Sequence, residues 1–321
     1  MTLAWGVIGA TSVVATQAVL PALRSSCSAV LAAVASRDGN AAAGVAEAFG
    51  ADRSYGRYED VLTDERVEAV YVPLPNGLHL EWVVRAAQAG KHVLCEKPLA
   101  CTAAEAGEMA DACAAAGVHL MEAYMTPFHP RAEALSGLLA AGALGEVRFA
   151  RSAFTFPLED AGNHRWRPEM GGGALLDLGV YCLTPLVEAG GGLPDRMAAR
   201  AVRASSGVDA SFSGWLEFPS GLAAAFCASF EAPERQHLEL VGTAATALVD
   251  TPFAGGAEGA VVRLVHRDGR QEDVDAPSRD PYLGMVEHFA AVVAGDAEPR
   301  RPPEDSVALL GLLDDLRAAA G

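Results

Sequence analysis

The feature that most constrains the fold is a regular alternation of apolar runs and helical segments over the first 121 residues. Short apolar runs occupy residues 3–8, 29–35, 69–72, 91–95 and 118–121, and helical stretches separate them. Strands that are buried on both faces read as continuous apolar runs, and strands that alternate with helices form a parallel sheet. The sequence therefore predicts an α/β Rossmann domain, a doubly wound parallel sheet, over residues 1–122.

The first turn of this domain has the composition of a phosphate-binding turn. The run 3–8 meets Gly9-Ala10-Thr11-Ser12, and a helix begins at Val13. In Rossmann folds the dinucleotide pyrophosphate lies at such a helix N-terminus. The Gly-x-Gly-x-x-Gly fingerprint is incomplete, because Thr11 and Val14 stand at its second and third glycine positions. The turn alone is therefore a weak indication of a dinucleotide site.

The end of the second strand favours NADP(H) over NAD(H). Ser36 and Arg37 follow the run 29–35. An acidic residue at this place binds the ribose hydroxyls of NAD, whereas an arginine accommodates the 2′-phosphate of NADP. Asp38 would repel that phosphate if it held the strand-end position. Because Asp38 precedes Gly39-Asn40, we interpret it as a turn or helix cap.

A charged pair follows the strand at residues 91–95. Glu96 and Lys97 stand there, and Pro98 stops the strand. Ligands of open parallel sheets bind at the carboxyl ends of the strands. Lys97 is thus placed to meet a ligand oxygen. The alternative is a surface ion pair at a strand end.

After Glu122 the rhythm changes from strand–helix alternation to consecutive strands. A helix at 131–141 is followed by a helix at 173–189 and by strands, and helices at 281–294 and 304–319 close the chain. We expect strands at 147–156, 196–204, 212–218, 222–230, 237–242, 247–250 and 261–266. The pattern predicts an α+β domain over residues 123–303 with an open, mainly antiparallel sheet. We expect the last helix, about 304–320, to pack back on the first domain.

A glycine-rich helix start carries the second candidate site. Gly171-Gly172-Gly173 open a helix that contains Asp177 and Tyr181, four residues apart and hence on one helix face. A carboxylate and a phenol on one face can form an acid–base or substrate-orienting pair. The alternative is a solvated helix with a half-buried tyrosine.

Composition excludes several classes of function. Lys plus Arg number 24 against 41 for Asp plus Glu, a net charge of −17, which argues against a nucleic-acid partner. No apolar run reaches the roughly 18 residues of a membrane span, and no signal peptide is recognised, so we expect a cytoplasmic protein without a membrane partner. The six cysteines form no Cys-x-x-Cys pair. We therefore expect reduced thiols and no metal site.

Together these residues resemble the Gfo/Idh/MocA family, named after glucose-fructose oxidoreductase, inositol dehydrogenase and a rhizopine-catabolism protein. The matching motifs are Trp5-Gly6-Val7-Ile8-Gly9-Ala10, Pro75-Asn76-Gly77-Leu78-His79, Gly90 through Leu99, Glu122-Ala123-Tyr124-Met125 and Gly171 through Tyr181. The Glu-Lys-Pro motif is the most specific, and the resemblance covers nearly the whole chain. It implies nicotinamide-linked hydride transfer on sugars or related alcohols and ketones, and a homo-oligomer, dimer or tetramer, formed through the C-terminal sheet.

The resemblance also implies roles for individual residues. The catalytic lysine of the family maps onto Lys97, and Tyr181 stands where many members have histidine. That departure is similar to the branch with glucose-fructose oxidoreductase, dihydrodiol dehydrogenase and ketoreductases of nucleotide-linked deoxysugars. We expect Lys97, Tyr181 and Asp177 to be catalytic, with Tyr181 donating a proton and Lys97 stabilising the developing alkoxide. Asp177 would orient the sugar hydroxyls or Lys97.

The remaining expected contacts fall into two sets. NADP(H) would contact Gly9, Ala10, Thr11, Ser12, Val13, Ser36, Arg37, Leu74, Pro75, Asn76, His79, Glu96, Lys97, Trp166, Arg167 and Tyr282. The substrate would contact Tyr124, His129, Arg165, Asp177 and Tyr181. For His129, capping of the following helix is an equal alternative.

Three functional hypotheses remain open. The first is an NADP(H)-dependent reductase of a nucleotide-linked keto-sugar, whose diphosphate Arg165 and Arg151 could hold. The second is a dihydrodiol or aldose dehydrogenase. The third is a non-catalytic NADP(H)-binding sensor, because fold does not determine function. Such a sensor is expected to lose Lys97 or Tyr181, and both are present.

Overall fold

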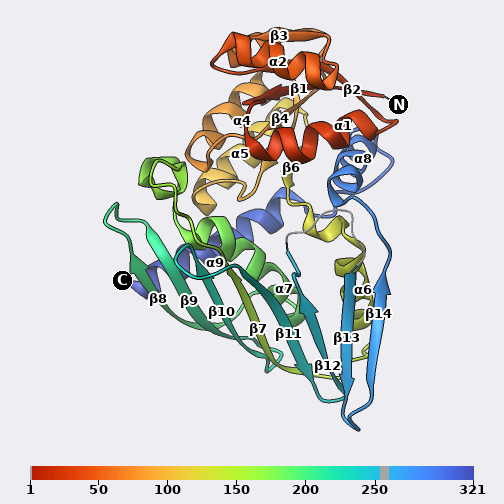
Figure 1. The fold of residues 1–321 in the computed structure, drawn as a ribbon, viewed down its shortest axis with the longest axis vertical. Helices are drawn as coiled ribbons and strands as arrows, with labels where there is room; N and C mark the ends of the chain where they lie inside the picture. Colours follow the sequence, from red (N-terminus) through yellow and green to blue (C-terminus); the bar gives the residue numbers. More distant parts are fainter. Residues whose placement is uncertain (1, 254–259) are drawn as a thin grey trace. The chain divides into compact units, whose positions relative to one another are not determined.

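The computed structural model describes residues 2–253 and 260–321, and the chain divides into two compact units. The first unit contains the residues up to Met125 together with Asp280–Val307. The second unit contains Thr126–Arg279 and Ala308–Gly321. Figure 1 labels most of the helices and strands of both units.

The first unit is built on a parallel sheet with the strand order β3-β2-β1-β4-β5-β6. This is the order of a Rossmann fold, so the predicted fold class of this part is confirmed. The strands are β1 (Leu3–Ile8), β2 (Ala29–Ala35), β3 (Arg53–Tyr55), β4 (Ala69–Val72), β5 (His92–Glu96) and β6 (Leu120–Ala123).

Helices cover both faces of this sheet. On one face the ring of Phe289 lies 5.4 Å from that of Trp5, and on the other Val61 packs at Gly6, where a β-carbon would collide with it. The glycine in β1 therefore allows a helix to approach the strand closely. The helices are α1 (Leu20–Ser25), α2 (Gly39–Phe49), α3 (Tyr58–Thr63), α4 (His79–Gln88), α5 (Ala103–Ala116) and α8 (Pro281–Val293), and α9 (Pro303–Ala320) begins in this unit.

The second unit is built on a mainly antiparallel sheet with the order β14-β13-β12-β11-β7-β10-β9-β8, in which β7 and β10 are parallel. This confirms the predicted second sheet. The strands are β7 (Val147–Thr155), β8 (Arg196–Arg203), β9 (Asp209–Glu217), β10 (Ala223–Ser229), β11 (Arg235–Gly242), β12 (Ala245–Asp250), β13 (Ala260–His266) and β14 (Gln271–Ala276).

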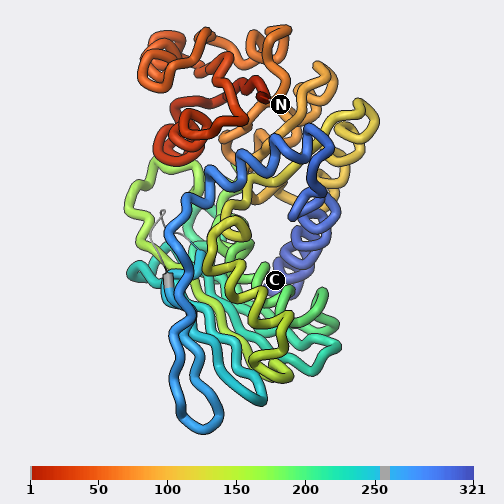
Figure 2. Tube along the Cα trace, turned by 90° about the vertical axis from the view of Figure 1, so that its right-hand side faces the viewer, coloured from red at the N-terminus to blue at the C-terminus, as the bar shows by residue number. Residues whose placement is uncertain are grey.

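One face of this second sheet carries helices and the other is open. Helix α7 (Val180–Gly190) packs on β7 and β10, and α6 (Pro130–Ala140) packs on β13 and β14, which form a hairpin at the sheet edge (Figure 2). The stretch Pro168–Gly190 is long and apolar enough to cross a membrane by length and composition, but 72% of its apolar 18-residue window is buried inside the protein. Such burial is typical of a core helix.

The structure differs from the expected organisation in three places. Helix α9 does not belong to the first unit as a whole, because its residues from Ala308 on group with the second unit, where Arg203 donates to the Gly321 carbonyl. Strands β3 and β14 were not expected from the sequence. Both are polar edge strands, so the apolar pattern that marks the buried strands is missing from them.

Candidate active site

The turn after β1 is tied to the end of β2. The amides of Gly9 and Ala10 both donate to the carbonyl of Ala35, at 3.0 and 2.9 Å. Gly9 has φ +79°, and a β-carbon there would lie 2.6 Å from Leu74 Cδ2. Only glycine combines that backbone conformation with this close approach of the loop after β4.

The helix start behind this turn is suited to a phosphate. Ser12 Oγ accepts from the amide of Ala15 at 3.2 Å, and Val13 is 68% exposed although it is apolar. A π-helical turn, Ala15–Val19, precedes α1, and π-turns are frequent at functional sites. These residues could therefore hold a dinucleotide phosphate, and the contact of Gly9 through Val13 with the cofactor stays a prediction.

The segment after β2 separates Asp38 from Ser36 and Arg37. Asp38 Oδ1 accepts from the amides of Asn40 and Ala41, at 2.9 and 3.3 Å, and caps α2. The interpretation of Asp38 as a helix cap is confirmed. Ser36 is buried with its Oγ 3.4 Å from that of Thr11, whereas Arg37 is exposed.

Arg37 has a neighbour that sequence reasoning missed. Burial raises the pKa of Tyr58, and the nearby Arg37 guanidinium, which bonds its phenol, opposes that shift. The Tyr58 ring packs edge-on against Trp82, with ring centres 5.1 Å apart. Tyr58 therefore holds Arg37 beside the end of β2. The only sequence signal was an aromatic residue at the start of a short helix.

The carboxyl end of β5 presents Lys97 next to a buried carboxyl group. The Tyr71 hydroxyl donates to Glu96 Oε1 at 2.6 Å, and the Lys97 amide donates to Glu96 Oε2 at 3.2 Å. Burial raises the pKa of Glu96 to about 7, against the opposing effects of Tyr71 and Lys97. Burial also raises the pKa of Tyr71, and the charges of Glu96 and Tyr282 add to that shift. Tyr282, at the start of α8, is thus close enough to Tyr71 to affect it electrostatically, and its contact with the cofactor stays a prediction.

His79 connects the loops after β4 and β5. Its ring is fully buried, with Nε2 2.8 Å from the Leu74 carbonyl oxygen and Nδ1 3.1 Å from those of Pro98 and Leu99. We expected His79 to contact the cofactor. In the structure both ring nitrogens lie close to backbone carbonyls, and the one N–H of the neutral ring donates to one of them, so His79 packs the segment at Leu74 against the segment after Lys97.

A second buried group supports the same segment. Glu122, in β6, accepts from the Leu99 amide at 2.8 Å through Oε1. Its Oε2 pairs with Arg301 Nε at 2.5 Å and accepts from Ser306 Oγ at 2.8 Å. The Arg301 guanidinium also lies 4.9 Å from the centre of the Tyr124 ring, which is 2% exposed. Tyr124, an expected substrate contact, is thus buried beneath Arg301 in this unit.

In the second unit the three glycines allow close packing of the preceding segment. The amides of Gly172 and Gly173 donate to the carbonyls of Arg167 and Arg165, at 3.1 and 3.0 Å. A β-carbon on Gly172 would collide with the Arg165 carbonyl oxygen, and Gly173 has φ +116°. The glycine run therefore fixes the Arg165–Arg167 segment on the helix start.

Asp177 and Tyr181 lie where the helix changes from π to α geometry. Asp177 is in the π-helical turn Leu175–Gly179, and its Oδ2 pairs with Arg165 Nε at 2.6 Å. Tyr181, at the start of α7, is 7% exposed and packs against Phe154 and Phe253, with ring centres 5.5 and 6.0 Å away. From the sequence we expected a regular α-helix and did not predict Arg165 as the partner of Asp177. The Asp177 carboxylate orients the Arg165 guanidinium.

Other expected contacts of this unit have defined surroundings. Trp166 packs edge-on against Phe230 at 5.4 Å between ring centres, and exposed Arg167 donates to the Gly162 carbonyl. His129 is buried and caps α6, since its Nδ1 accepts from the Arg131 amide at 3.1 Å. The capping alternative for His129 is confirmed.

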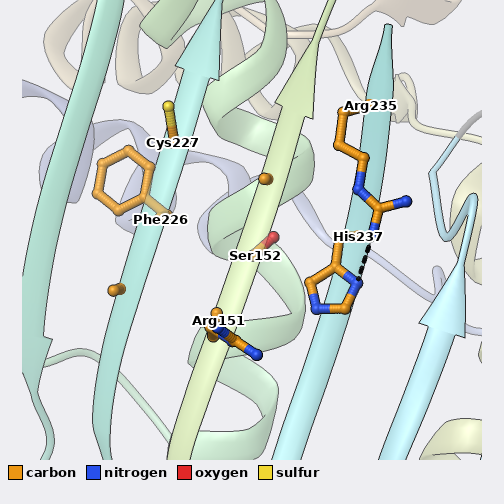
Figure 3. A pocket seen from close by; sticks show the side chains of 8 residues that line it. Arg151, Ser152, Phe226, Cys227, Arg235 and His237 are labelled. Carbon is orange, nitrogen blue, oxygen red and sulfur yellow. Dashed lines mark hydrogen bonds between the residues drawn. The ribbon is translucent and has the colours of Figure 1, made fainter.

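Arg151 lies on the other side of the second sheet from Tyr181. It pairs across the strands with Glu239 and lines a hollow on the open face together with Arg235 and His237 (Figure 3). Phe154, also in β7, lies on the opposite face and contacts Tyr181 of α7. Arg151 therefore cannot hold a ligand jointly with Arg165, and that part of the diphosphate hypothesis is wrong.

Within the part of the chain that the structure describes, no group of three or more His, Cys, Asp and Glu side chains is placed to hold a metal ion. The first unit thus carries a candidate nucleotide-binding turn and Lys97, and the second unit carries a helix start with Arg165, Asp177 and Tyr181.

Comparison with known proteins matches segments of both units to models of one family. Residues 3–124 match the model of an oxidoreductase family with an NAD-binding Rossmann fold, GFO/IDH/MocA, and residues 133–248 match the C-terminal domain of the same family. A D-xylose 1-dehydrogenase (NADP(+)) of Haloferax volcanii is 38% identical over 98% of this chain and 97% of that protein. A dTDP-3,4-didehydro-2,6-dideoxy-alpha-D-glucose 3-reductase of Actinomadura kijaniata is 33% identical over 98% of this chain and 95% of that protein.

The solved structures include close matches to the whole chain. A 3-ketoreductase from Actinomadura kijaniata in complex with NADP and TDP-benzene superposes with a TM-score of 0.92, at 31% identity, over 99% of this chain and 98% of that one.

Proposed function

Since this chain belongs to the Gfo/Idh/MocA family of oxidoreductases, we propose that it transfers hydride between NADP(H) and a sugar-derived ketone or alcohol, with a nucleotide-linked keto-sugar as the favoured substrate. The observation that carries the proposal is Lys97 at the carboxyl end of β5, on a segment that buried His79 and Glu122 hold in place. A cation fixed at such a strand end is suited to stabilise an oxygen anion.

NADPH, when bound, supplies the hydride, and the residues of this chain supply binding and proton transfer. Gly9 through Val13 hold the pyrophosphate, and Ser36 with Arg37 hold the 2′-phosphate. Lys97 stabilises the alkoxide oxygen that develops during reduction, and Tyr181 donates the proton. Cofactor-bound relatives and NADP-dependent relatives support this assignment.

The Arg165–Asp177 pair favours an anionic substrate. Asp177 holds the guanidinium of Arg165 at 2.6 Å, and the side chain of Arg165 is 32% exposed. A guanidinium fixed in this way is suited to a phosphate or diphosphate group. Relatives named as reductases of a dTDP-linked keto-sugar agree with this substrate class.

A neutral substrate is the second candidate. The relative named as a D-xylose dehydrogenase is more similar in sequence than the dTDP-sugar reductases, at 38% against 33% identity for the reductase from Actinomadura kijaniata. An aldose or a dihydrodiol oxidised with NADP⁺ is therefore the alternative, and a cofactor-binding sensor is the non-catalytic one.

The open face of the second sheet is the proposed oligomer interface of a cytoplasmic enzyme. Phe149, Val202, Trp215 and Val261 are between 38% and 48% exposed, and the strand register places them on the face of Arg151. Large apolar side chains gathered on one face are typical of a protein–protein contact. Light scattering at several protein concentrations tests this part, and a monomer at all of them would contradict it.

The test of function is a rate comparison with matched substrates. NADPH and NADH are supplied with a dTDP-linked 3-keto-sugar, and NADP⁺ and NAD⁺ with D-xylose and with a cyclic dihydrodiol. Turnover of the nucleotide-linked substrate with NADPH supports the proposal. Turnover of only the neutral substrates supports the alternative, and tight NADPH binding without turnover of any of them supports the sensor.

A further inference from the structure

We propose that Asp209 is a positioning residue for the helix that carries Asp177 and Tyr181; this inference rests on the proposed roles of those two residues. Asp209 is the first residue of β9 and is 9% exposed. It lies outside the sequence motifs that indicated the site, and the topology brings it to the start of the helix.

The hydrogen bond caps the helix from a different element. Asp209 Oδ2 accepts from the backbone amide of Leu175 at 2.6 Å. Leu175 begins the π-helical turn, and the residue before it, Ala174, gives no side-chain cap. The first amides of a helix have no partner within the helix. The carboxylate of Asp209 therefore supplies the cap that the local sequence lacks, and its charge suits a helix N-terminus.

Gly173 provides the space that this contact needs. A β-carbon at Gly173 would collide with Asp209 Oδ1, and the φ of +116° is one that side-chain-bearing residues rarely adopt. The amide of Gly173 also donates to the Arg165 carbonyl at 3.0 Å. Asp209 thus contacts the same three-residue stretch, Gly173 to Leu175, that anchors the backbone of Arg165.

The contact acts on both groups of the candidate site in this unit. Asp177 follows Leu175 by two residues and holds Arg165 through its carboxylate. Tyr181 follows on the same continuous helical stretch. A shift of the helix start would therefore move the carboxylate, its guanidinium and the phenol together, and small displacements of reacting groups lower rates strongly.

The surroundings of Asp209 keep its carboxylate in place. Burial raises the pKa of Asp209, while the bond from Leu175 and the charges of Arg317 in α9 and Arg203 in β8 oppose that shift. A buried carboxylate is costly unless such partners stabilise it. A buried carboxylate held by these partners at the helix start agrees with a rigid cap.

The experiment compares three changes at Asp209 with a control. Asp209→Ala removes the acceptor, Asp209→Ser shortens it, and Asp209→Asn keeps an oxygen that can accept from Leu175. Asp195→Asn is the control, because Asp195 is exposed and lies just before β8. For Asp209→Ala we expect kcat to fall about tenfold to a hundredfold, because a shifted helix start misplaces the reacting groups. NADPH affinity should change by less than about threefold, since the candidate nucleotide-binding turn belongs to the other unit, and Asp209→Asn should restore kcat to within about threefold of wild type.

A wild-type kcat for Asp209→Ala, or an Asp209→Asn variant as slow as Asp209→Ala, overturns the proposal. If Asp209→Ala does not fold, Asp209→Ser takes its place in the comparison. Hydrogen exchange of the 174–182 peptide gives an independent readout: it should be faster in Asp209→Ser than in Asp195→Asn. Equal exchange in the two variants overturns the proposed cap.

A double-mutant cycle separates this inference from the proposed function. If Asp209 acts by positioning Tyr181, Asp209→Ala should lower kcat by no more than about threefold in a Tyr181→Phe background, because the positioned group is already lost. An equal loss in both backgrounds contradicts the positioning role. A wild-type kcat for Tyr181→Phe alone would instead refute the proposed proton donor, in a variant in which Asp209 is unchanged.

Discussion

The buried pair of Glu122 and Arg301 gives a prediction whose size follows from the structure. Their side chains are only 1% and 10% exposed, and Arg301 Nε lies 2.5 Å from Glu122 Oε2. Glu122→Gln keeps an oxygen for the Leu99 amide but leaves the Arg301 guanidinium without its carboxylate. Removing one partner of a buried ion pair costs about 3–5 kcal/mol, because the remaining charge stays buried. We expect that loss in the stability of the first unit.

Most of the stability lost in Glu122→Gln should be regained when the charge of Arg301 is also removed. In Glu122→Gln with Arg301→Met, the buried guanidinium is gone, and the methionine replaces much of its apolar stem. We expect the double variant to be destabilised by less than about 2 kcal/mol relative to wild type, well below the sum of the single changes.

The assay follows urea unfolding of the first unit alone. Trp5 and Trp82 belong to this unit, whereas Trp166 and Trp215 belong to the second. In a Trp166→Phe, Trp215→Phe background, tryptophan fluorescence therefore reports the first unit. With a urea dependence of about 1–3 kcal/mol per molar, a loss of 3–5 kcal/mol lowers the midpoint by at least about 1 M. A midpoint unchanged by Glu122→Gln, or a double variant as unstable as the sum of the two, would refute the reasoning.

Three further predictions concern the chemistry of the site. Tyr181→Phe should lower kcat by about 10²–10⁴ with little change in KM, measured by steady-state kinetics, because a proton donor acts only as charge develops; a raised KM at unchanged kcat would show that Tyr181 only binds. Arg37→Ala should weaken NADPH about tenfold to a hundredfold and leave NADH unaffected, measured by cofactor fluorescence titration; an equal effect on both cofactors contradicts the assignment. Burial raises the pKa of Glu96 to about 7, so the folded state retains a proton that the unfolded state releases. The contribution of Glu96 to the free energy of unfolding is therefore fully present below the usual carboxyl pKa and is lost as pH rises through 7. Wild type should therefore lose roughly 3 kcal/mol of stability between about pH 5 and pH 8 through Glu96, and Glu96→Gln should abolish that loss. If Glu96→Gln leaves the pH dependence of urea unfolding unchanged, the result argues against that pKa.

The Rossmann unit could be predicted because its buried strands are recognisable from short local stretches of sequence. Residues 3–8, 29–35 and 69–72 are continuous apolar runs, and β1, β2 and β4 have those bounds. The same criterion gave a wrong boundary for β5, because we expected that strand to begin at Lys91. Its ammonium instead bonds the carbonyls of Asp64 and Val67, and β5 begins at His92.

The groups that support the candidate site could not be predicted, because their partners are distant in sequence. Folding brings Glu122 into an ion pair with Arg301, and it brings the Asp209 carboxylate to the Leu175 amide. His79 was recognised within a motif, but its contacts with Leu99 and Leu74 depend on how two loops pack. A motif identifies residue types at a strand end, whereas the orientation of each side chain depends on long-range hydrogen bonds.

The most direct test of the account is a single-turnover measurement of hydride transfer with Lys97→Met. The protein is saturated with NADPH, mixed with the substrate that the rate comparison identifies, and followed by the absorbance of the reduced nicotinamide. We expect the rate to fall by about 10²–10⁴, while NADPH affinity stays within about threefold of wild type, because Lys97 acts on the reacting oxygen. A wild-type rate of hydride transfer in Lys97→Met would contradict the central claim that the lysine at the end of β5 is catalytic.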